Sequence, residues 1–193
     1  MTSQGNYAVA VGPNAGADTQ GAQAVAVGAN AGQYTQGTYA VALGNSAGNE
    51  NQGSEGIAIG NVAGNHQGDY AIAMGSYAGS YTGTGTISIG TNSGINAGNY
   101  SVALGYQAGN YYDTAPLGQY AIAIGYRASY DQGVDNSIVL NASGDQLNAS
   151  VAGLYINPIR YTETQDSTYD GLMFYNSSTK EVRYSYILDG GAF

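Results

Sequence analysis

The chain has 193 residues and a net charge of −9, with 31 glycines, 19 tyrosines, two phenylalanines, no cysteine and only 9% charged residues, whereas ordinary soluble domains carry roughly 25%. Its four basic residues all follow position 126, so nucleic acid and anionic membrane surfaces are not expected as partners. No apolar run approaches the roughly 20 residues of a membrane span, so membrane insertion is not expected either.

A short motif recurs nine times between residues 8 and 141. It starts as AVAVG at 8–12 and 24–28, continues as AVALG, GIAIG, AIAMG, TISIG, SVALG and AIAIG, and ends in a degenerate SIVLN at 137–141. The closing glycines of the first eight copies are separated by 16, 16, 16, 15, 15, 15 and 20 residues, and a second small motif such as NAG follows each of them. Self-similarity of this kind predicts a solenoid in which each repeat forms one coil.

Small and bulky residues alternate within each copy, which predicts a short strand with two different faces. Glycine and Asn/Gln-rich connections follow each strand and favour turns. Roughly 15 residues per coil leave room for two five-residue strands and two turns, with neighbouring coils about 4.8 Å apart. The sequence therefore predicts an all-β solenoid of about nine coils of 15–16 residues.

The two faces of the strand are predicted to play different roles. We place the bulky residues, such as Val9, Val11, Ile57 and Ile59, inside the roll, opposite the small residues of the second motif. A column of exposed alanines on the other face would suit the close approach of another backbone, which three protomers around an axis would supply. The predicted homotrimer interface consists of Ala10, Ala26, Ala42, Ala73, Ala103 and Ala123.

The segments NYAVAVGPNAG, GTYAVALGNSAG and GNYSVALGYQAG resemble the YadA-like head repeats of trimeric autotransporter adhesins, and the resemblance covers about residues 5–142. It implies a left-handed parallel β-roll that assembles as a homotrimer into an adhesive, extracellular head. The repeats are longer than is usual in the family and rich in tyrosine, so the resemblance does not imply a particular ligand.

The repeat is lost from position 143, which predicts two domains, 1–142 and 143–193. GLYINPIRY at 153–161 is typical of an edge strand or bend at Pro158, and LMFYN at 172–176 with EVRYSYIL at 181–188 predicts a hairpin that caps the solenoid or holds the trimer. SIVLNASGDQLNASVAGLYINPIR and GLMFYNSSTKEVRYS resemble the segment that follows such repeats in tail-fibre-like proteins of phages and large DNA viruses.

Together the two resemblances imply a trimeric fibre head that attaches to a glycan or protein on a host surface, in a virion fibre or tail. A bacterial surface adhesin fragment is the alternative, and a structural fibre module without a ligand is a third. A glycan-cleaving tailspike would need two carboxyl groups roughly 5 to 9.5 Å apart, yet carboxylates do not recur at one repeat position. The lone His66 is interpreted as a solvated turn residue, and we expect no enzyme, metal or cofactor.

Tyrosine is the residue type that points to binding. Tyr7, Tyr39, Tyr70, Tyr100 and Tyr120 precede repeat strands and are interpreted as turn-capping ladders, whereas tyrosines in the connections offer flat apolar area with a polar tip. The 20-residue step between glycines places an insertion within NYYDTAP at 110–116, and insertions in solenoids map to surface loops. A loop that packs its tyrosines onto the roll is the rival interpretation. The predicted receptor-binding residues are Tyr81, Tyr111, Tyr112 and Asp113.

Overall fold

The computed structural model describes residues 3–110, 116–159, 172–176, 178 and 181–185. These residues form strands and turns but no helix, so none of them contributes a helix long and apolar enough to cross a bilayer. The chain divides into two compact units, Met1–Pro158 and Ile159–Phe193.

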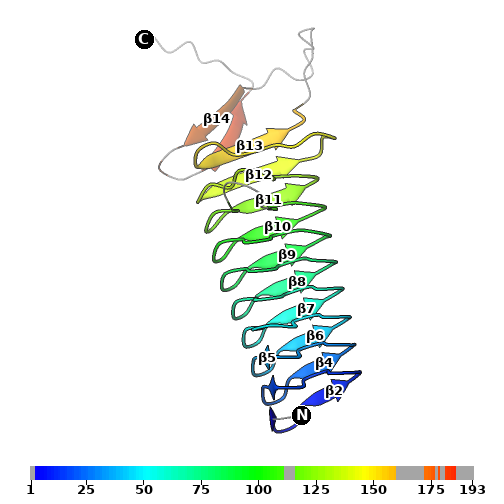
Figure 1. Cartoon of the computed structure of the whole chain (residues 1–193). Coiled ribbons are helices and arrows are strands. Elements are labelled where there is room, and N and C mark those ends of the chain that lie inside the picture. The colour runs from blue at the N-terminus through cyan, green and yellow to red at the C-terminus, as the bar shows by residue number, and fades with distance from the viewer. Residues whose placement is uncertain (1–2, 111–115, 160–171, 177, 179–180, 186–193) are drawn as a thin grey trace, which may run out of the picture. The chain divides into compact units, whose positions relative to one another are not determined.

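The first unit is a stack of coils, each of which contributes one short strand to a single parallel sheet (Figure 1). The pairing keeps equivalent repeat positions in line, so that Ala26 lies opposite Ala42 and Ala42 opposite Ala58. The predicted all-β parallel solenoid is confirmed. Its strands are β2 (Val9–Val11), β4 (Val25–Val27), β6 (Val41–Leu43), β7 (Ile57–Ile59), β8 (Ile72–Met74), β9 (Ile87–Ile89), β10 (Val102–Leu104), β11 (Ile122–Gly125), β12 (Ser137–Asn141) and β13 (Gly153–Asn157).

The last of these strands extends the solenoid beyond residue 142, where the sequence predicts its end. β13 pairs in parallel with β12, and Ile138 lies opposite Leu154. The first unit accordingly ends at Pro158. In the second unit, β14 (Leu172–Asn176) and β15 (Glu181–Ser185) pair antiparallel, as expected for the predicted hairpin.

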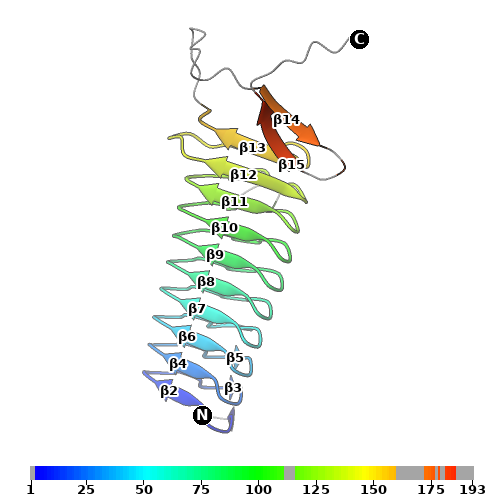
Figure 2. The same cartoon turned by 180° about the vertical axis from the view of Figure 1, so that it is seen from behind.

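Among the residues that the structure describes, a second wall of strands is confined to the first coils, where β1 (Ser3–Gln4), β3 (Thr19–Gln20) and β5 (Thr35–Gln36) form a short parallel sheet (Figure 2). The coils therefore do not use the room that they have for two five-residue strands, since the strands of this wall have two residues each. From the third coil on, a residue at positive φ interrupts the extended backbone here, beginning with Asn51 (49°), His66 (55°) and Tyr81 (58°). Left-handed backbone cannot continue a strand ladder.

The interior of the roll is built from small residues, which reverses the predicted orientation of the strands. Five of the six alanines predicted at the trimer interface have an exposed fraction of 0%, and Ala10, in the first coil, is partly buried against the same cluster. A side chain with no exposed surface in the single chain has nothing left to bury against a partner. These five alanines are Ala26, Ala42, Ala73, Ala103 and Ala123.

The width of the roll explains the correction. A Cβ atom built on Gly64 would lie 2.7 Å from the Cβ of Ala58, and one on Gly79 would lie 2.6 Å from the Cβ of Ala73. The alanines of the sheet thus pack almost directly against the opposite backbone, where second-motif alanines such as Ala63 and Ala78 complete the core. Because a larger aliphatic side chain in place of Ala58 or Ala73 would collide with this backbone, the bulky residues of the strands point outward.

A column of buried glutamines, which the sequence interpretation missed, closes the interior of the first coils. Gln20, Gln36, Gln52 and Gln67 are each at most 2% exposed. Gln36 Nε2 donates to the backbone carbonyl of Val25 at 2.8 Å and to Oε1 of Gln52 at 3.2 Å. Buried amides are stable when they are bonded in this way. The recurring Gln-Gly at 20–21, 36–37, 52–53 and 67–68 is the sequence signal of this column.

Candidate functional site

The outer face of the long sheet carries two columns of bulky aliphatic side chains, hereafter the aliphatic face. Every outward position is Val, Ile, Leu or Met, and none of these side chains is fully buried. Val11 and Leu154, near the two ends, are each 55% exposed. The first column is Val9, Val25, Val41, Ile57, Ile72, Ile87, Val102, Ile122, Ile138 and Leu154; the second is Val11, Val27, Leu43, Ile59, Met74, Ile89, Leu104, Ile124, Leu140 and Ile156.

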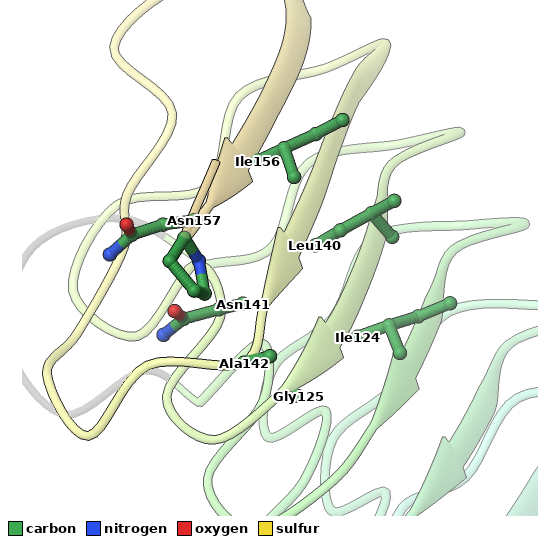
Figure 3. A pocket seen from close by; sticks show the side chains of 8 residues that line it. Ile124, Gly125, Leu140, Asn141, Ala142, Ile156 and Asn157 are labelled. Carbon is green, nitrogen blue, oxygen red and sulfur yellow. The ribbon is translucent and has the colours of Figure 1, made fainter. Parts of the chain in front are cut away.

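The aliphatic face is continuous with a pocket at its C-terminal end (Figure 3). The pocket has a volume of about 400 Å³, and the side chains of Ile124, Leu140 and Ile156 project side by side along it. On its polar side, Asn141 Nδ2 donates to the carbonyls of Tyr126 at 2.6 Å and Asp145 at 2.7 Å. Since this amide is already engaged, the pocket is suited to an apolar side chain.

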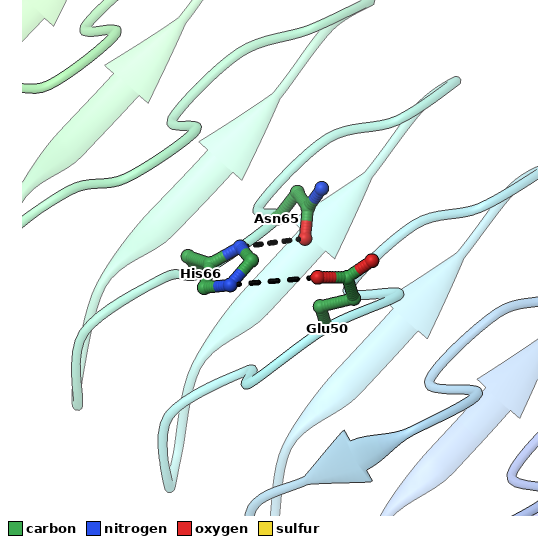
Figure 4. Close-up of polar contacts among 3 residues, drawn as sticks. All are labelled: Glu50, Asn65 and His66. Carbon is green, nitrogen blue, oxygen red and sulfur yellow. Dashed lines mark hydrogen bonds and ion pairs between the residues drawn. The ribbon is translucent and has the colours of Figure 1, made fainter.

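One corner of the roll brings together Glu50, His66 and Tyr81 on successive coils. His66 Nε2 lies 3.5 Å from Glu50 Oε2, and its Nδ1 lies 3.1 Å from Asn65 Oδ1 (Figure 4). The imidazole also stacks on the Tyr81 ring, with 4.5 Å between centroids and 10° between planes. His66 is therefore a partly exposed turn residue held by a carboxylate and an aromatic ring.

Of the predicted insertion at 110–116, Asn110 and Pro116 are among the residues that the structure describes. The backbone N–H of Tyr81 donates to the carbonyl of Asn65 on the preceding coil, and the N–H of Asn96 on the next coil donates to the carbonyl of Ser80. Asn110 lies one coil beyond Asn96, so a single coil stands between the coils of Tyr81 and Asn110. Tyr81 is 57% exposed. The other predicted receptor-binding residues, Tyr111, Tyr112 and Asp113, lie outside the described residues.

A second corner carries the tyrosines that stand two residues before strands of the long sheet. The chain has positive φ at this position in every coil from Tyr7 to Asn136. From Gln23 on, the backbone N–H of each such residue donates to a carbonyl of the coil before it, as Tyr70 does to Ser54. Left-handed backbone costs roughly 1–2 kcal/mol for residues with a Cβ and is usually left to glycine or asparagine. Tyr39, Tyr70, Tyr100 and Tyr120 adopt it while remaining 54–59% exposed.

A third corner places Arg127 among aromatic rings near the C-terminal end of the roll. Its guanidinium lies 5.3 Å from the centroid of Tyr126 and 4.8 Å from that of Tyr130, and its Nε donates to Gln107 Oε1 at 2.9 Å. Tyr126 in turn stacks on Tyr106 of the preceding coil. The guanidinium is held in place by these contacts.

None of these corners has the composition of a metal or catalytic centre. Among the residues that the structure describes, no three His, Cys, Asp or Glu side chains gather where they could hold a metal ion. His66 and Glu50, which approach each other at 3.5 Å, are both partly exposed.

Comparison with known proteins supports an adhesin-type head. Two copies of the YadA head domain repeat match residues 3–31, which span the first two strands of the long sheet. YadA heads are adhesin-type modules of trimeric, surface-displayed proteins. No curated protein and no solved structure matches the chain. The predicted resemblance of the C-terminal segment to tail-fibre-like proteins has no support from these comparisons.

Proposed function

We propose that this chain forms the homotrimeric head of an extracellular fibre and attaches it to a cell surface. The observation that carries the proposal is the aliphatic face, which extends over ten strands, or nine spacings of about 4.8 Å, for a length of about 43 Å. Exposed apolar patches of this extent mark interaction surfaces. Two further copies of the same chain are the occupants that we assign to it.

Symmetry and charge favour that assignment. Three copies that turn the aliphatic face toward a common axis bury the same surface on each protomer. No outward position of the sheet carries a charge, so the approach of like faces is not opposed by repulsion. Each half-exposed aliphatic side chain that becomes buried contributes roughly 1 kcal/mol, and two columns of them outweigh an association cost of about 4–15 kcal/mol. An apolar side chain of a neighbouring copy would fill the pocket beside Ile124 and Leu140.

Attachment follows from the similarity of the first coils to an adhesin-type repeat. A trimer presents every surface site three times, so weak individual contacts add to firm binding when all three engage the same cell. We propose a virion fibre or tail as the setting, with a bacterial cell surface as the alternative. The sequence resemblance of the C-terminal segment is what supports the virion setting.

We propose that the receptor contact includes Tyr81, with Tyr111, Tyr112 and Asp113 of the insertion as its further residues. Exposed tyrosine among Asn, Ser and Thr suits both sugars and protein surfaces. In support, Tyr81 is fixed by its stack on His66, which reduces the entropy lost on binding.

The test is to replace residues 110–116 with Asn-Gly and to measure attachment of the fluorescently labelled head to host cells. We expect attachment to be lost while the melting temperature stays within a few degrees of the parent protein. Tyr77→Asn, an exposed tyrosine on another corner, is the control and should leave attachment unchanged. Retained attachment in the loop variant would remove the insertion from the site, and a parent trimer that attaches to no cell would contradict the function.

A further inference from the structure

The tyrosines Tyr39, Tyr70, Tyr100 and Tyr120, hereafter the tyrosine row, occupy one corner of the roll. They stand at equivalent positions, two residues before a strand of the long sheet. The backbone N–H groups of Tyr100 and Tyr120 donate to the carbonyls of Thr84 and Asn99 on the preceding coils, as in the rest of this corner. The corner is therefore a straight ladder parallel to the stacking direction, and the tyrosine row follows it.

The tyrosine row is not explained by the stability of the roll. Its members have φ between 55° and 60°, a backbone conformation that is unfavourable for residues with bulky side chains. Each of these tyrosines nevertheless leaves more than half of its surface exposed. Gly85 and Asn136 occupy the same position in other coils and are the residue types that suit this backbone. Strain that is kept without burial is characteristic of functional positions.

The rings have a regular spacing. Tyr39, Tyr70 and Tyr100 are each two coils apart, which corresponds to about 9.6 Å at a strand spacing of about 4.8 Å. A Cβ on Gly85 would lie 2.9 Å from Cδ1 of Tyr100, so the glycine leaves room for that ring to lean over its coil. Tyr120, one coil further on, stacks on Tyr100 with 5.6 Å between centroids and 12° between planes. The result is a discontinuous strip of aromatic surface along the roll.

This spacing matches a particular polymer chemistry. In an extended β1,4-linked glycan each sugar is turned over relative to the last, so the same ring face recurs at every second sugar. Each sugar advances the chain by close to one strand spacing, so aromatic rings on alternate coils meet equivalent sugar faces. Tyrosine rings pack on the apolar C–H face of a sugar, and their hydroxyl groups reach its polar edge.

The charges along the corner define the polymer further. Glu55 stands between Tyr39 and Tyr70 on the ladder, and Asp69 directly precedes Tyr70. No lysine or arginine occurs before Arg127. Like charges disfavour the approach of sulfated or uronic-acid polymers, so the surface suits an uncharged chain.

We propose that the tyrosine row binds an extended, uncharged, β1,4-linked polysaccharide whose chain runs along the solenoid. The proposal rests on the attachment function and names the class of ligand for a second surface, on a different corner from Tyr81. From Tyr39 to Tyr120 the row spans five strand spacings, or about 24 Å, which sets the length of glycan that it can engage.

The test uses β1,4-linked N-acetylglucosamine oligosaccharides from the disaccharide to the hexasaccharide, titrated calorimetrically into the 193-residue chain. We expect affinity to rise mainly when an added sugar reaches the next tyrosine and to level off at the hexasaccharide. The β1,3-linked glucose hexasaccharide, whose chain curves, should bind at least about tenfold more weakly, a difference of about 1.4 kcal/mol.

The decisive variant is Tyr70→Asn combined with Tyr100→Asn, because asparagine suits the same backbone. It should lower the affinity for the hexasaccharide at least about tenfold, with an unchanged or higher melting temperature and unchanged mass in solution. Tyr77→Asn, at φ 56° on another corner, should retain parent affinity. Unchanged affinity in the double variant, or no binding of the hexasaccharide by the parent, would overturn the proposal. Dissociation of the double variant into single chains would also overturn it, because the row would then belong to contacts between copies. Cell attachment that survives the double variant while sugar binding is lost would leave the attachment function standing and overturn only the role of this row in it.

Discussion

The two faces of the long sheet are made of neighbouring residues on the same strands, yet they follow opposite rules of size. From β4 to β11 the central inward position, as in Ala73, is a fully buried alanine or serine, whereas outward positions such as Ile72 and Met74 are bulky and partly exposed. Over these strands the roll is so narrow that alanine, serine and glycine line its interior beneath the sheet. The bulky outward side chains add little to the stability of an isolated roll, because they remain partly exposed to water. We therefore interpret them as a surface that binds another molecule.

The largest effect should come from enlarging an inward position. Ala73→Leu would push a branched side chain into the backbone at Gly79, and we expect the solenoid to lose about 3 kcal/mol of unfolding free energy. Met74→Leu, one residue away on the outer face, should change it by less than about 0.5 kcal/mol. Urea unfolding followed by circular dichroism measures both. Equal effects at the two positions would mean that the faces do not differ in this way.

A smaller effect should come from the glutamine column, which distinguishes the first coils from the later ones. Gln36→Ala removes the side-chain amide that donates to the carbonyl of Val25 and to Gln52, and we expect the loss of both hydrogen bonds to lower the unfolding free energy by about 2 kcal/mol. Gln119→Ala, at an exposed position, is the control and should be neutral in the same urea experiment. A neutral Gln36→Ala would show that the column fills space without contributing hydrogen bonds to stability.

The repeat period and the closing glycines were sufficient to predict the parallel solenoid, because identical coils can stack only in register. The orientation of the strands was not predicted, since the rule that bulky residues are buried assumes an interior wide enough to hold them. The small residues of both motifs, for example Ala58 and Ala63, indicated the correct orientation, because two columns of small side chains can pack against each other across a narrow interior. The tenth coil was missed because GLYIN at 153–157 follows a connection that lacks the second motif.

Of the candidate surfaces, the sequence indicated Tyr81 and the tyrosines of the corner ladder but not their surroundings. The stack of Tyr81 on His66 joins residues 15 positions apart and depends on coil register, which composition does not reveal. The strained backbone of the tyrosine row is likewise a property of the folded turn, since the same position accepts Gly85 and Asn136. The aliphatic residues were recognised as a column, and their exposure became evident only from the width of the roll.

The most direct test of the central claim, that the aliphatic face is buried between copies of this chain, is the mass in solution by analytical ultracentrifugation. We expect three times 19.7 kDa for the parent protein at micromolar concentration, and 19.7 kDa with an unchanged circular dichroism spectrum for Ile72→Asp, which places a charge in the middle of the face. A parent protein that sediments as a folded monomer of 19.7 kDa would contradict the account.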